Sequence, residues 1–185
     1  MPRLFVALRP PPAIRQRLLS LADDLPGARW QDDDQLHLTL RFIGEVDRPL
    51  AEDVAACIAA VHAPAPAVAL AGVGAFRSRG RGAQLWAGVA PVETLRHLHA
   101  KVEQACRRAG LPPEHRSFHP HITVARLSRS VAATTAVDRW LANHAALTGS
   151  PFSLAHLILY QSVLGRDGAC YEAVMRWPLD TGDWE

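Results

Sequence analysis

The most informative stretch of the sequence is Leu36-His-Leu-Thr-Leu-Arg-Phe-Ile43, an apolar run that carries His37 and Thr39. Side chains of a β-strand alternate between its two faces, so residues two positions apart point the same way. The run therefore places an imidazole and a hydroxyl together on one face, while Leu38 between them faces the core.

The same His-x-Thr pattern recurs in the run His119-Pro-His-Ile-Thr-Val-Ala125, where it consists of His121 and Thr123. Ile122 takes the place of the core-facing leucine. Histidine has an ordinary pKa of about 6.5 and can give or accept a proton near neutral pH. If folding brings the two copies into one cleft, two imidazoles can act as general acid and general base. Two hydroxyls beside them can hold the oxygens of a phosphate.

The composition is that of a folded globular protein. The chain has 185 residues, 49% of them hydrophobic and 21% charged, which suits a single domain over residues 1–185. No apolar run reaches the ~20 residues needed to cross a bilayer, and the N-terminal apolar stretch is too short for a signal peptide. We therefore expect a cytoplasmic monomer without membrane contact or a protein partner. The net charge of +2 excludes a polycationic nucleic-acid coat protein, so any nucleic-acid contact should be local.

Hydrophobic periodicity and turn residues predict alternating helices and strands along the whole chain. Each half offers a strand, a helix, the His-x-Thr strand, a further helix and further strands, which indicates two halves of similar architecture. Outside the motifs we expect helices from prolines 11–12 to just before Pro26, from Pro49, from Pro91 to Gly110, and at 131–147. We expect strands at 3–8, 29–31, 68–76, 84–89, 152–163 and 169–177.

Phosphodiester hydrolysis needs one group that deprotonates the attacking water and another that protonates the departing oxygen. The two histidines supply both groups without a metal or an organic cofactor. A metal-dependent phosphatase would need clustered carboxylates, and the one acidic run, 32–34, is typical of a solvated turn. A zinc site at His119 and His121, with His115 nearby, is the remaining metal alternative.

The motif runs, extended to 36–46 and 118–126, resemble the paired signatures of the two-histidine (2H) phosphoesterase superfamily. Within it, the chain is similar to the RNA 2′,3′-cyclic phosphodiesterases, historically named 2′-5′ RNA ligases. The likeness continues at 3–8, 159–165, 171–172 and 176–179, and so covers nearly the whole chain. It implies a bilobal α+β fold in which two antiparallel β-sheets, flanked by helices, surround a central cleft with pseudo-twofold symmetry.

The resemblance also implies an activity and a substrate. The substrate is an RNA that ends in a 2′,3′-cyclic phosphate, and the product is a 2′-phosphomonoester. Some relatives carry out a reversible 2′-5′ ligation of RNA, and no cofactor is implied.

Residue by residue, the resemblance implies that His37 and His121 are catalytic and that Thr39 and Thr123 bind the phosphate. A 2′-phosphate product requires the P–O3′ bond to break. By analogy, His37 is expected to protonate the leaving 3′-oxygen and His121 to activate the water.

Phe42 and Arg126 match a base-stacking residue and a phosphate contact of that family. Strict alternation from His37 would instead make Phe42 an ordinary core residue. It would also turn Arg126 away from His121 unless the strand ends or bulges there. Arg41 shares the face of His37 by parity, where it either helps to bind phosphate or pairs with an acid.

Some alternatives remain open from the sequence. Arginines 77, 79 and 81 lie in a predicted hairpin loop, which is either an RNA-backbone contact or a solvated tip. The enzyme could act on a small nucleotide such as ADP-ribose cyclic phosphate. A non-catalytic RNA-end binding module is a third function, although a binder needs no matched acid and base. The sequence leaves undecided the physiological RNA and the cellular importance of ligation.

Overall fold

A computed structural model describes the chain except residues 24, 79–81, 166–167 and 183–185. None of the helices in the described part is both long and apolar enough to pass through a membrane. In chain order the elements are β1 (Arg3–Leu8), α1 (Pro12–Leu19), β2 (Ala28–Trp30), the 3₁₀ turn η1 (Asp33–Gln35), β3 (Leu38–Glu45), α2 (Arg48–Ala59), β4 (Ala67–Arg77), β5 (Ala83–Ala90), α3 (Glu93–Arg108), β6 (His121–Leu127), α4 (Arg129–Ala132), α5 (Thr135–His144), β7 (Phe152–Ser153), β8 (His156–Gly165) and β9 (Gly168–Pro178).

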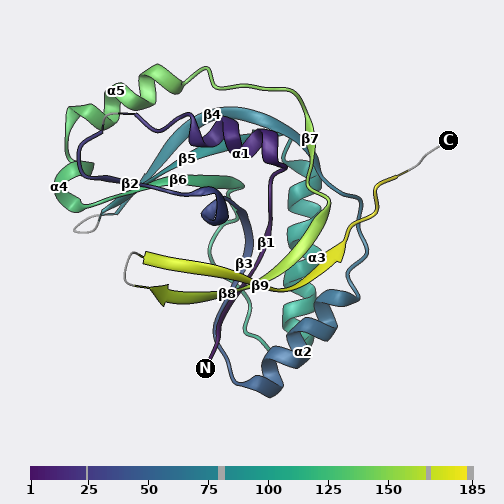
Figure 1. The fold of residues 1–185 in the computed structure, drawn as a ribbon. Coiled ribbons are helices and arrows are strands. Elements are labelled where there is room, and N and C mark those ends of the chain that lie inside the picture. The colour runs from purple at the N-terminus through teal and green to yellow at the C-terminus, as the bar shows by residue number, and fades with distance from the viewer. Residues whose placement is uncertain (24, 79–81, 166–167, 183–185) are drawn as a thin grey trace.

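The strands form one curled antiparallel sheet in the order β7-β4-β5-β6-β3-β1-β8-β9, with β2 paired to β6 (Figure 1). The first motif belongs to the half made of β3, β1, β8 and β9, and the second to the half made of β6, β5, β4 and β7. The halves meet where β3 pairs with β6 at Leu38 and Ile122. The α+β class and the two-half architecture are as expected. The two expected sheets are joined at this seam into one.

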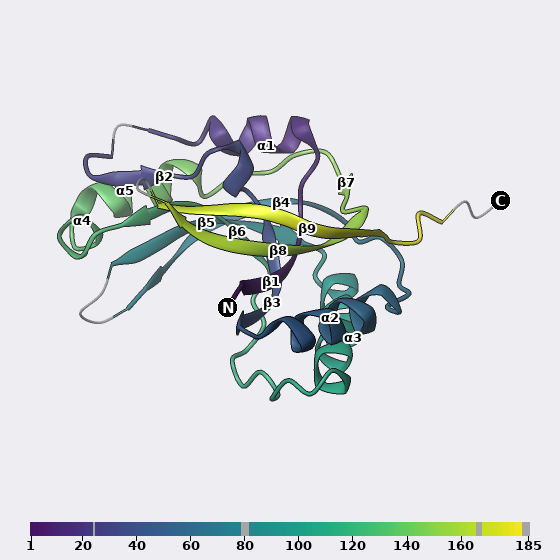
Figure 2. The same cartoon turned by 60° about the horizontal axis from the view of Figure 1, so that its bottom comes forward.

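The helices cover the sheet with the apolar faces that the sequence predicted. On α3, the inward residues Leu95, Leu98, Val102 and Cys106 are all fully buried. Gly110 follows this helix with φ +98°, a left-handed conformation that favours glycine. α3 packs against α2 and β3, whereas α4 and α5 pack against β6 and β4 (Figure 2). Each half therefore has its own helical support.

The helix predicted at 131–147 is wrong as one continuous element. α4 ends at Ala132, and Thr134 is the extended N-cap of α5 at φ −88° and ψ 152°. The Thr134 hydroxyl donates a hydrogen bond to the Val131 carbonyl at 2.8 Å. A local bond of this kind offers the backbone an alternative to the helix, which explains the break.

Two other predicted elements are shorter or divided. α1 ends at Leu19, although Leu21 and Leu25 beyond it remain buried in the core. The strand predicted at 152–163 divides into β7 and β8. These strands lie in different halves, because β7 pairs with β4 while β8 pairs with β1 and β9.

Candidate active site

Each His-x-Thr motif shows the alternation that the sequence predicted. In both motifs the histidine and threonine keep partial exposure, and the residue between them is fully buried. The partly exposed residues are His37 and Thr39 in the first motif and His121 and Thr123 in the second, and the buried ones are Leu38 and Ile122.

The seam brings the two motifs onto one face of the sheet. Leu38 and Ile122 pair in antiparallel strands, so the residues that flank them lie side by side on the opposite face. The first histidine lies on the side of the second threonine, and the second histidine on the side of the first threonine. We call His37, Thr39, His121 and Thr123 the His-Thr quartet.

Both imidazoles are oriented by a carbonyl two residues earlier in the chain. Nδ1 of His37 lies 2.8 Å from the Gln35 oxygen, and Nδ1 of His121 lies 2.6 Å from the His119 oxygen. A carbonyl only accepts hydrogen bonds, so each Nδ1 carries a proton and donates it. In a neutral ring this leaves Nε2 as the basic nitrogen, and both rings therefore offer the same atom for proton transfer.

The environment of the quartet disfavours charge on the imidazoles. Burial lowers the pKa of His37 to about 4, and the positive charges of Arg126 and His121 act in the same direction. The hydrogen bond to the Gln35 carbonyl acts against this shift. Burial also lowers the pKa of His121. Arg126 and His121 belong to β6, so the second half of the sheet acts electrostatically on the first.

Aromatic rings enclose the His37 ring. The centroid of Phe5 lies 4.9 Å away, Tyr171 meets the imidazole edge-on at 5.1 Å, and Tyr160 lies at 6.1 Å. These rings come from β1, β9 and β8. Their low polarity accounts for the desolvation that depresses the pKa of His37.

The second histidine has a smaller aromatic wall. Phe76 of β4 meets His121 edge-on at 4.8 Å, and Trp86 of β5 lies at 6.1 Å. His119 lies 6.3 Å from the same Phe76 ring. Both histidines of the quartet therefore rest against aromatic side chains of the neighbouring strands.

The turn before His37 is held by a capping box. The Asp32 carboxylate accepts from the Gln35 backbone N–H at 3.0 Å, and the Gln35 side-chain oxygen accepts from the Asp32 N–H at 3.1 Å. The Gln35 side-chain amide also donates to the Ala169 carbonyl at 2.9 Å, which connects η1 to β9. These bonds fix the residue whose carbonyl orients His37.

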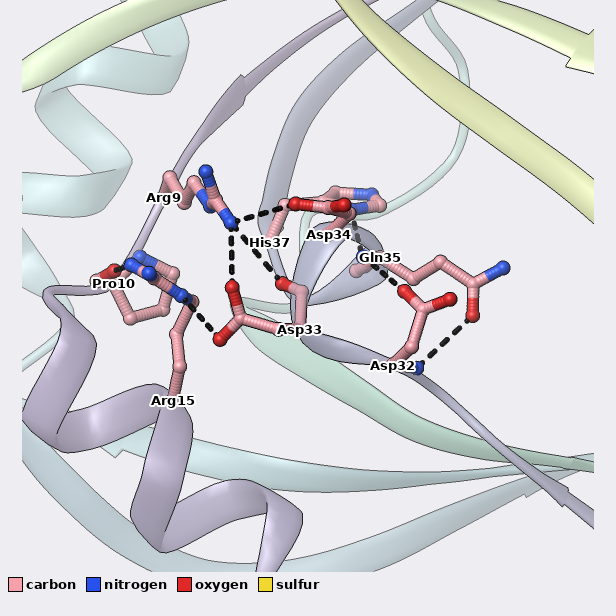
Figure 3. Close-up of polar contacts among 8 residues, drawn as sticks. All are labelled: Arg9, Pro10, Arg15, Asp32, Asp33, Asp34, Gln35 and His37. Atoms are coloured by element: carbon pink, nitrogen blue, oxygen red, sulfur yellow. Dashed lines mark hydrogen bonds and ion pairs between the residues drawn. The ribbon is translucent and has the colours of Figure 1, made fainter.

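Two arginines anchor the same turn (Figure 3). Arg9 Nη2 lies 2.9 Å from Asp33 Oδ2 and 3.2 Å from Asp34 Oδ1, and Arg15 Nε lies 2.8 Å from Asp33 Oδ1. The hydrogen bond from Arg15 lowers the pKa of Asp33. The prediction of a solvated acidic turn is confirmed for Asp32 and Asp34, which are exposed, whereas Asp33 is 39% exposed and is held by both arginines.

A β-bulge places Phe42 on the face of His37. The register of β3 against β1 skips Leu40, and one extra residue in a strand reverses the alternation of side chains beyond it. Phe42 is 51% exposed, with its ring 6.1 Å from Phe5, which also contacts His37. The core position that strict alternation gave Phe42 is wrong. Its role in base stacking stays a prediction.

The second motif has a bulge at the equivalent position. The register of β6 against β5 skips Val124, which returns Arg126 to the face of Thr123. Arg126 is partly exposed and lies near enough to lower the pKa of His37. Phe42 and Arg126 thus occupy corresponding places, each five residues after the histidine of its motif.

Arg41 does not share the face of His37, because the bulge turns it into the interior. It is 7% exposed, and its Nε lies 2.7 Å from Glu103 Oε2 and its Nη1 3.3 Å from Glu114 Oε2. Its Nη2 donates to the Pro112 carbonyl at 2.6 Å. The alternative that Arg41 pairs with an acid is confirmed. The pair connects β3 to α3 and to the loop that leads to His121.

Two further expectations concern the arginines at 77, 79 and 81 and a possible metal site. Arg77 Nη2 lies 2.6 Å from Asp138 Oδ1, and arginines 79 and 81 lie outside the described residues. The RNA-contact hypothesis for that loop is therefore untested. In the described part of the chain, no three or more His, Cys, Asp and Glu side chains gather closely enough to hold a metal ion.

Neither the aromatic rings around the histidines nor the anchors of η1 were predicted from the sequence. Nothing in the periodicity distinguishes Phe5 or Tyr160 from other core residues. The Asp-x-x-Gln pattern at 32–35 is a capping-box signature and was the one available signal for the turn.

Comparisons with known proteins agree with this geometry. The model of a family described as the 2′-5′ RNA ligase superfamily matches residues 10–166. An RNA 2′,3′-cyclic phosphodiesterase of Aeropyrum pernix is 32% identical over 146 residues, which cover 77% of this chain and 81% of that protein. A protein of the same name from Escherichia coli is 28% identical, with 96% of each chain covered. The crystal structure of E. coli LigT complexed with 3′-AMP superposes with a TM-score of 0.74 at 26% identity, over 97% of this chain and 99% of that one.

Proposed function

The chain belongs to the 2′-5′ RNA ligase superfamily, and from that membership we propose that it hydrolyses 2′,3′-cyclic phosphate ends of RNA to 2′-phosphomonoesters. The observation that carries the proposal is the pairing of Leu38 with Ile122. This pairing gathers two imidazoles and two hydroxyls on one face. We also propose that the protein is a cytoplasmic monomer and that its one partner is its substrate.

The reaction requires two proton transfers. A water oxygen forms a new bond to phosphorus while the base takes a proton from that water. The P–O3′ bond breaks, and the acid gives a proton to the departing 3′-oxygen. We assign the base to His121 and the acid to His37, each through Nε2. Thr39 and Thr123 donate hydrogen bonds to the non-bridging oxygens, and Arg126 offsets their charge.

The electrostatics of the free protein bear on this assignment. A pKa of about 4 leaves His37 neutral near pH 7, whereas an acid must carry a proton. A bound phosphodiester is an anion, and a nearby negative charge raises the pKa of both imidazoles. It also pairs with Arg126, whose charge lowers the pKa of His37 in the free protein. Substrate binding therefore favours the protonated acid.

The same geometry accommodates 2′-5′ ligation. A 5′-hydroxyl of a second RNA takes the place of water, and loss of O3′ then leaves a 2′-5′ phosphodiester. Hydrolysis and ligation share the broken bond and both proton transfers. The proportion of the two reactions depends on which hydroxyl reaches the phosphorus.

The test is to incubate the purified protein with an RNA oligonucleotide that ends in a 2′,3′-cyclic phosphate, with and without excess chelator. Chromatography against synthetic 2′- and 3′-phosphate standards identifies the product. We expect the 2′-phosphate in both conditions. A 3′-phosphate product would mean that the P–O2′ bond breaks, which would contradict the proposed leaving group. Binding without turnover would favour a non-catalytic RNA-end module.

The division of roles has its own test. A substrate with sulfur in place of the 3′-oxygen has a leaving group that needs little protonation. It should restore turnover to a variant that lacks the acid and leave a variant that lacks the base inactive. We expect this rescue for His37→Ala and not for His121→Ala, and the opposite result would exchange the two roles.

A further inference from the structure

A basic cavity of about 250 Å³ lies beside the first turn of α1, outside the His-Thr quartet. It is formed by the residues that follow β1, by the start of α1 and by β8 and β9. Its polar side chains are those of three arginines, one histidine and Ser153, and its apolar wall is made of prolines, one isoleucine and Ala155. The residues that matter here are Arg9, Arg15, Arg176, His156, Ile158 and prolines 10–12.

The cavity opens on the same face of the sheet as the quartet. Ala7 pairs with Thr39 on one side and with Ile158 on the other, and Ile158 pairs with Arg176. Residues directly paired in antiparallel strands point to the same face. Arg176 therefore lies three strand spacings, or about 14 Å, from Thr39 on this face of the sheet. A few nucleotides of single-stranded RNA can span that interval.

The cavity keeps unused hydrogen-bond donors. Arg9 meets Asp33 and Asp34 through Nη2, and its Nε is buried without a partner among the described residues. Arg15 uses Nε for Asp33 and Nη1 for the Pro10 carbonyl, which leaves Nη2. A guanidinium carries five N–H donors, so both arginines retain capacity for an oxyanion.

Arg176 gives the cavity its excess of positive charge. Asp33 and Asp34 balance Arg9 and Arg15, whereas Arg176 forms no ion pair with any described residue. All three guanidiniums act on Tyr160: burial raises the pKa of this phenol, and the arginines oppose that shift. Tyr160 also lies 6.1 Å from His37. Tyr160 therefore lies within range of both the cavity arginines and the first histidine of the quartet.

A planar guanidinium matches the oxygens of a phosphate with two parallel hydrogen bonds, which makes arginine the usual residue for recognition of phosphodiesters. We propose that this cavity binds a backbone phosphate of the RNA strand on the 5′ side of the cyclic end, with Arg176 as the main contact. The proposal rests on the proposed function and extends it, because it assigns a second contact to the RNA strand away from the reacting phosphate. The prolines and Ile158 then form the wall that borders the ribose.

A series of substrates of increasing length tests the proposal. Each substrate ends in a 2′,3′-cyclic phosphate, and the series runs from the mononucleotide through successively longer RNA oligonucleotides. We expect kcat/KM of the unmodified enzyme to rise about tenfold once the strand reaches the cavity, the range of a hydrogen bond to a charged group. Arg176→Glu should remove this rise, and Arg176→Ala should reduce it.

The mononucleotide serves as an internal reference that separates loss of the RNA contact at Arg176 from unfolding, because that substrate does not extend to the cavity. We expect all Arg176 variants to hydrolyse it at the unmodified rate. The matched control is Arg96→Ala, which removes an exposed arginine of α3 and should preserve the length dependence. The dependence of log kcat/KM on log salt for the longest RNA should lose about one unit of slope in Arg176→Ala.

The outcomes separate this proposal from the proposed function. Hydrolysis of every substrate without any dependence on length would overturn the cavity proposal and support the enzyme assignment. An equal loss on mononucleotide and oligonucleotide in Arg176→Glu would also overturn it. Failure of the unmodified protein to hydrolyse any substrate of the series would overturn the proposed function, and the cavity proposal with it.

Discussion

The two histidines of the quartet make the same hydrogen bond from the ring, but different residues support the carbonyl that accepts it. Each donates from Nδ1 to a carbonyl two residues earlier. Behind His37 that carbonyl belongs to a 3₁₀ turn fixed by a capping box and by two arginines. Behind His121 it belongs to an irregular loop, which Arg41 secures at Glu114 and Pro112.

This difference shows which parts of a pseudo-symmetric site have to match. Proton transfer depends on the tautomer and direction of each ring, and these are the same in both halves. The supports only have to hold a carbonyl in place, and each half does so with unrelated residues. The pKa of His37 is lowered to about 4 by its denser enclosure. The halves therefore differ in electrostatics while they agree in geometry.

The largest effect that we expect comes from removing either ring. His37→Ala and His121→Ala should each lower kcat by about 10²–10⁴, the usual contribution of a general acid or base. If the halves form one site, the double variant should be little worse than either single variant. Steady-state kinetics on a cyclic-phosphate RNA measure this, with the exposed His62→Ala as control. Near-full activity in one single variant would show that only one half is catalytic.

Loss of the Arg41 ion pairs, which support the second half, should lower the stability of the fold more than loss of the support of the first half. Arg41→Ala leaves Glu103 and Glu114 without their buried partner, so we expect the free energy of unfolding to fall by about 3–5 kcal/mol. Denaturant titration measures the change. Arg48→Ala breaks an exposed pair with Glu52 and should leave stability nearly unchanged. Equal stability of the two variants would mean that the interior pair is not what secures the loop.

Loss of the first support should affect catalysis more than stability. Asp33→Asn weakens the pairs with Arg9 and Arg15 at a partly exposed position, so the turn that carries Gln35 is held less firmly. We expect kcat to fall about tenfold with little change in KM, because ring orientation matters most in the transition state. Asp34→Asn, at the exposed end of the same run, is the matched control. A change confined to KM would assign Asp33 to substrate binding.

The pH dependence should reveal the electrostatic difference between the halves. Catalysis needs one protonated and one neutral ring, and the pKa values of both histidines lie below 6.5 in the free protein. Above that pH both rings become neutral, and at low pH both become protonated, His37 near pH 4. We therefore expect a bell-shaped kcat/KM profile with its maximum on the acid side of 6.5. A maximum above neutral pH, with chemistry rate-limiting, would contradict this, whichever ring is the acid.

The sequence was sufficient for the parts that depend on local pattern. Period-two alternation placed Leu38 and Ile122 in the core, and helical spacing identified the buried face of α3. The resemblance to a known family predicted the juxtaposition of the motifs, which no local pattern contains. Whether His37, Thr39, His121 and Thr123 act as assigned stays a prediction until the variants are measured.

Alternation failed where the backbone departs from a regular strand. The bulges at Leu40 and Val124 invert the faces of Arg41, Phe42 and Arg126, and neither position carries a residue that marks a bulge. A bulge is fixed by the register of the neighbouring strand, which is a long-range property. The ion pairs of Arg41 likewise join segments more than sixty residues apart. Such features follow from tertiary packing and not from periodicity.

In the described residues, one rung of backbone pairing, Leu38 with Ile122, joins the strands that carry the two motifs. The same strand β6 also pairs with β2, which leads directly into the turn before His37. The Gln31 N–H extends this contact to the Val124 carbonyl at 2.9 Å. The turn that carries the first histidine is therefore bonded on both sides to the strand that carries the second, so a shift of β6 would displace both rings together.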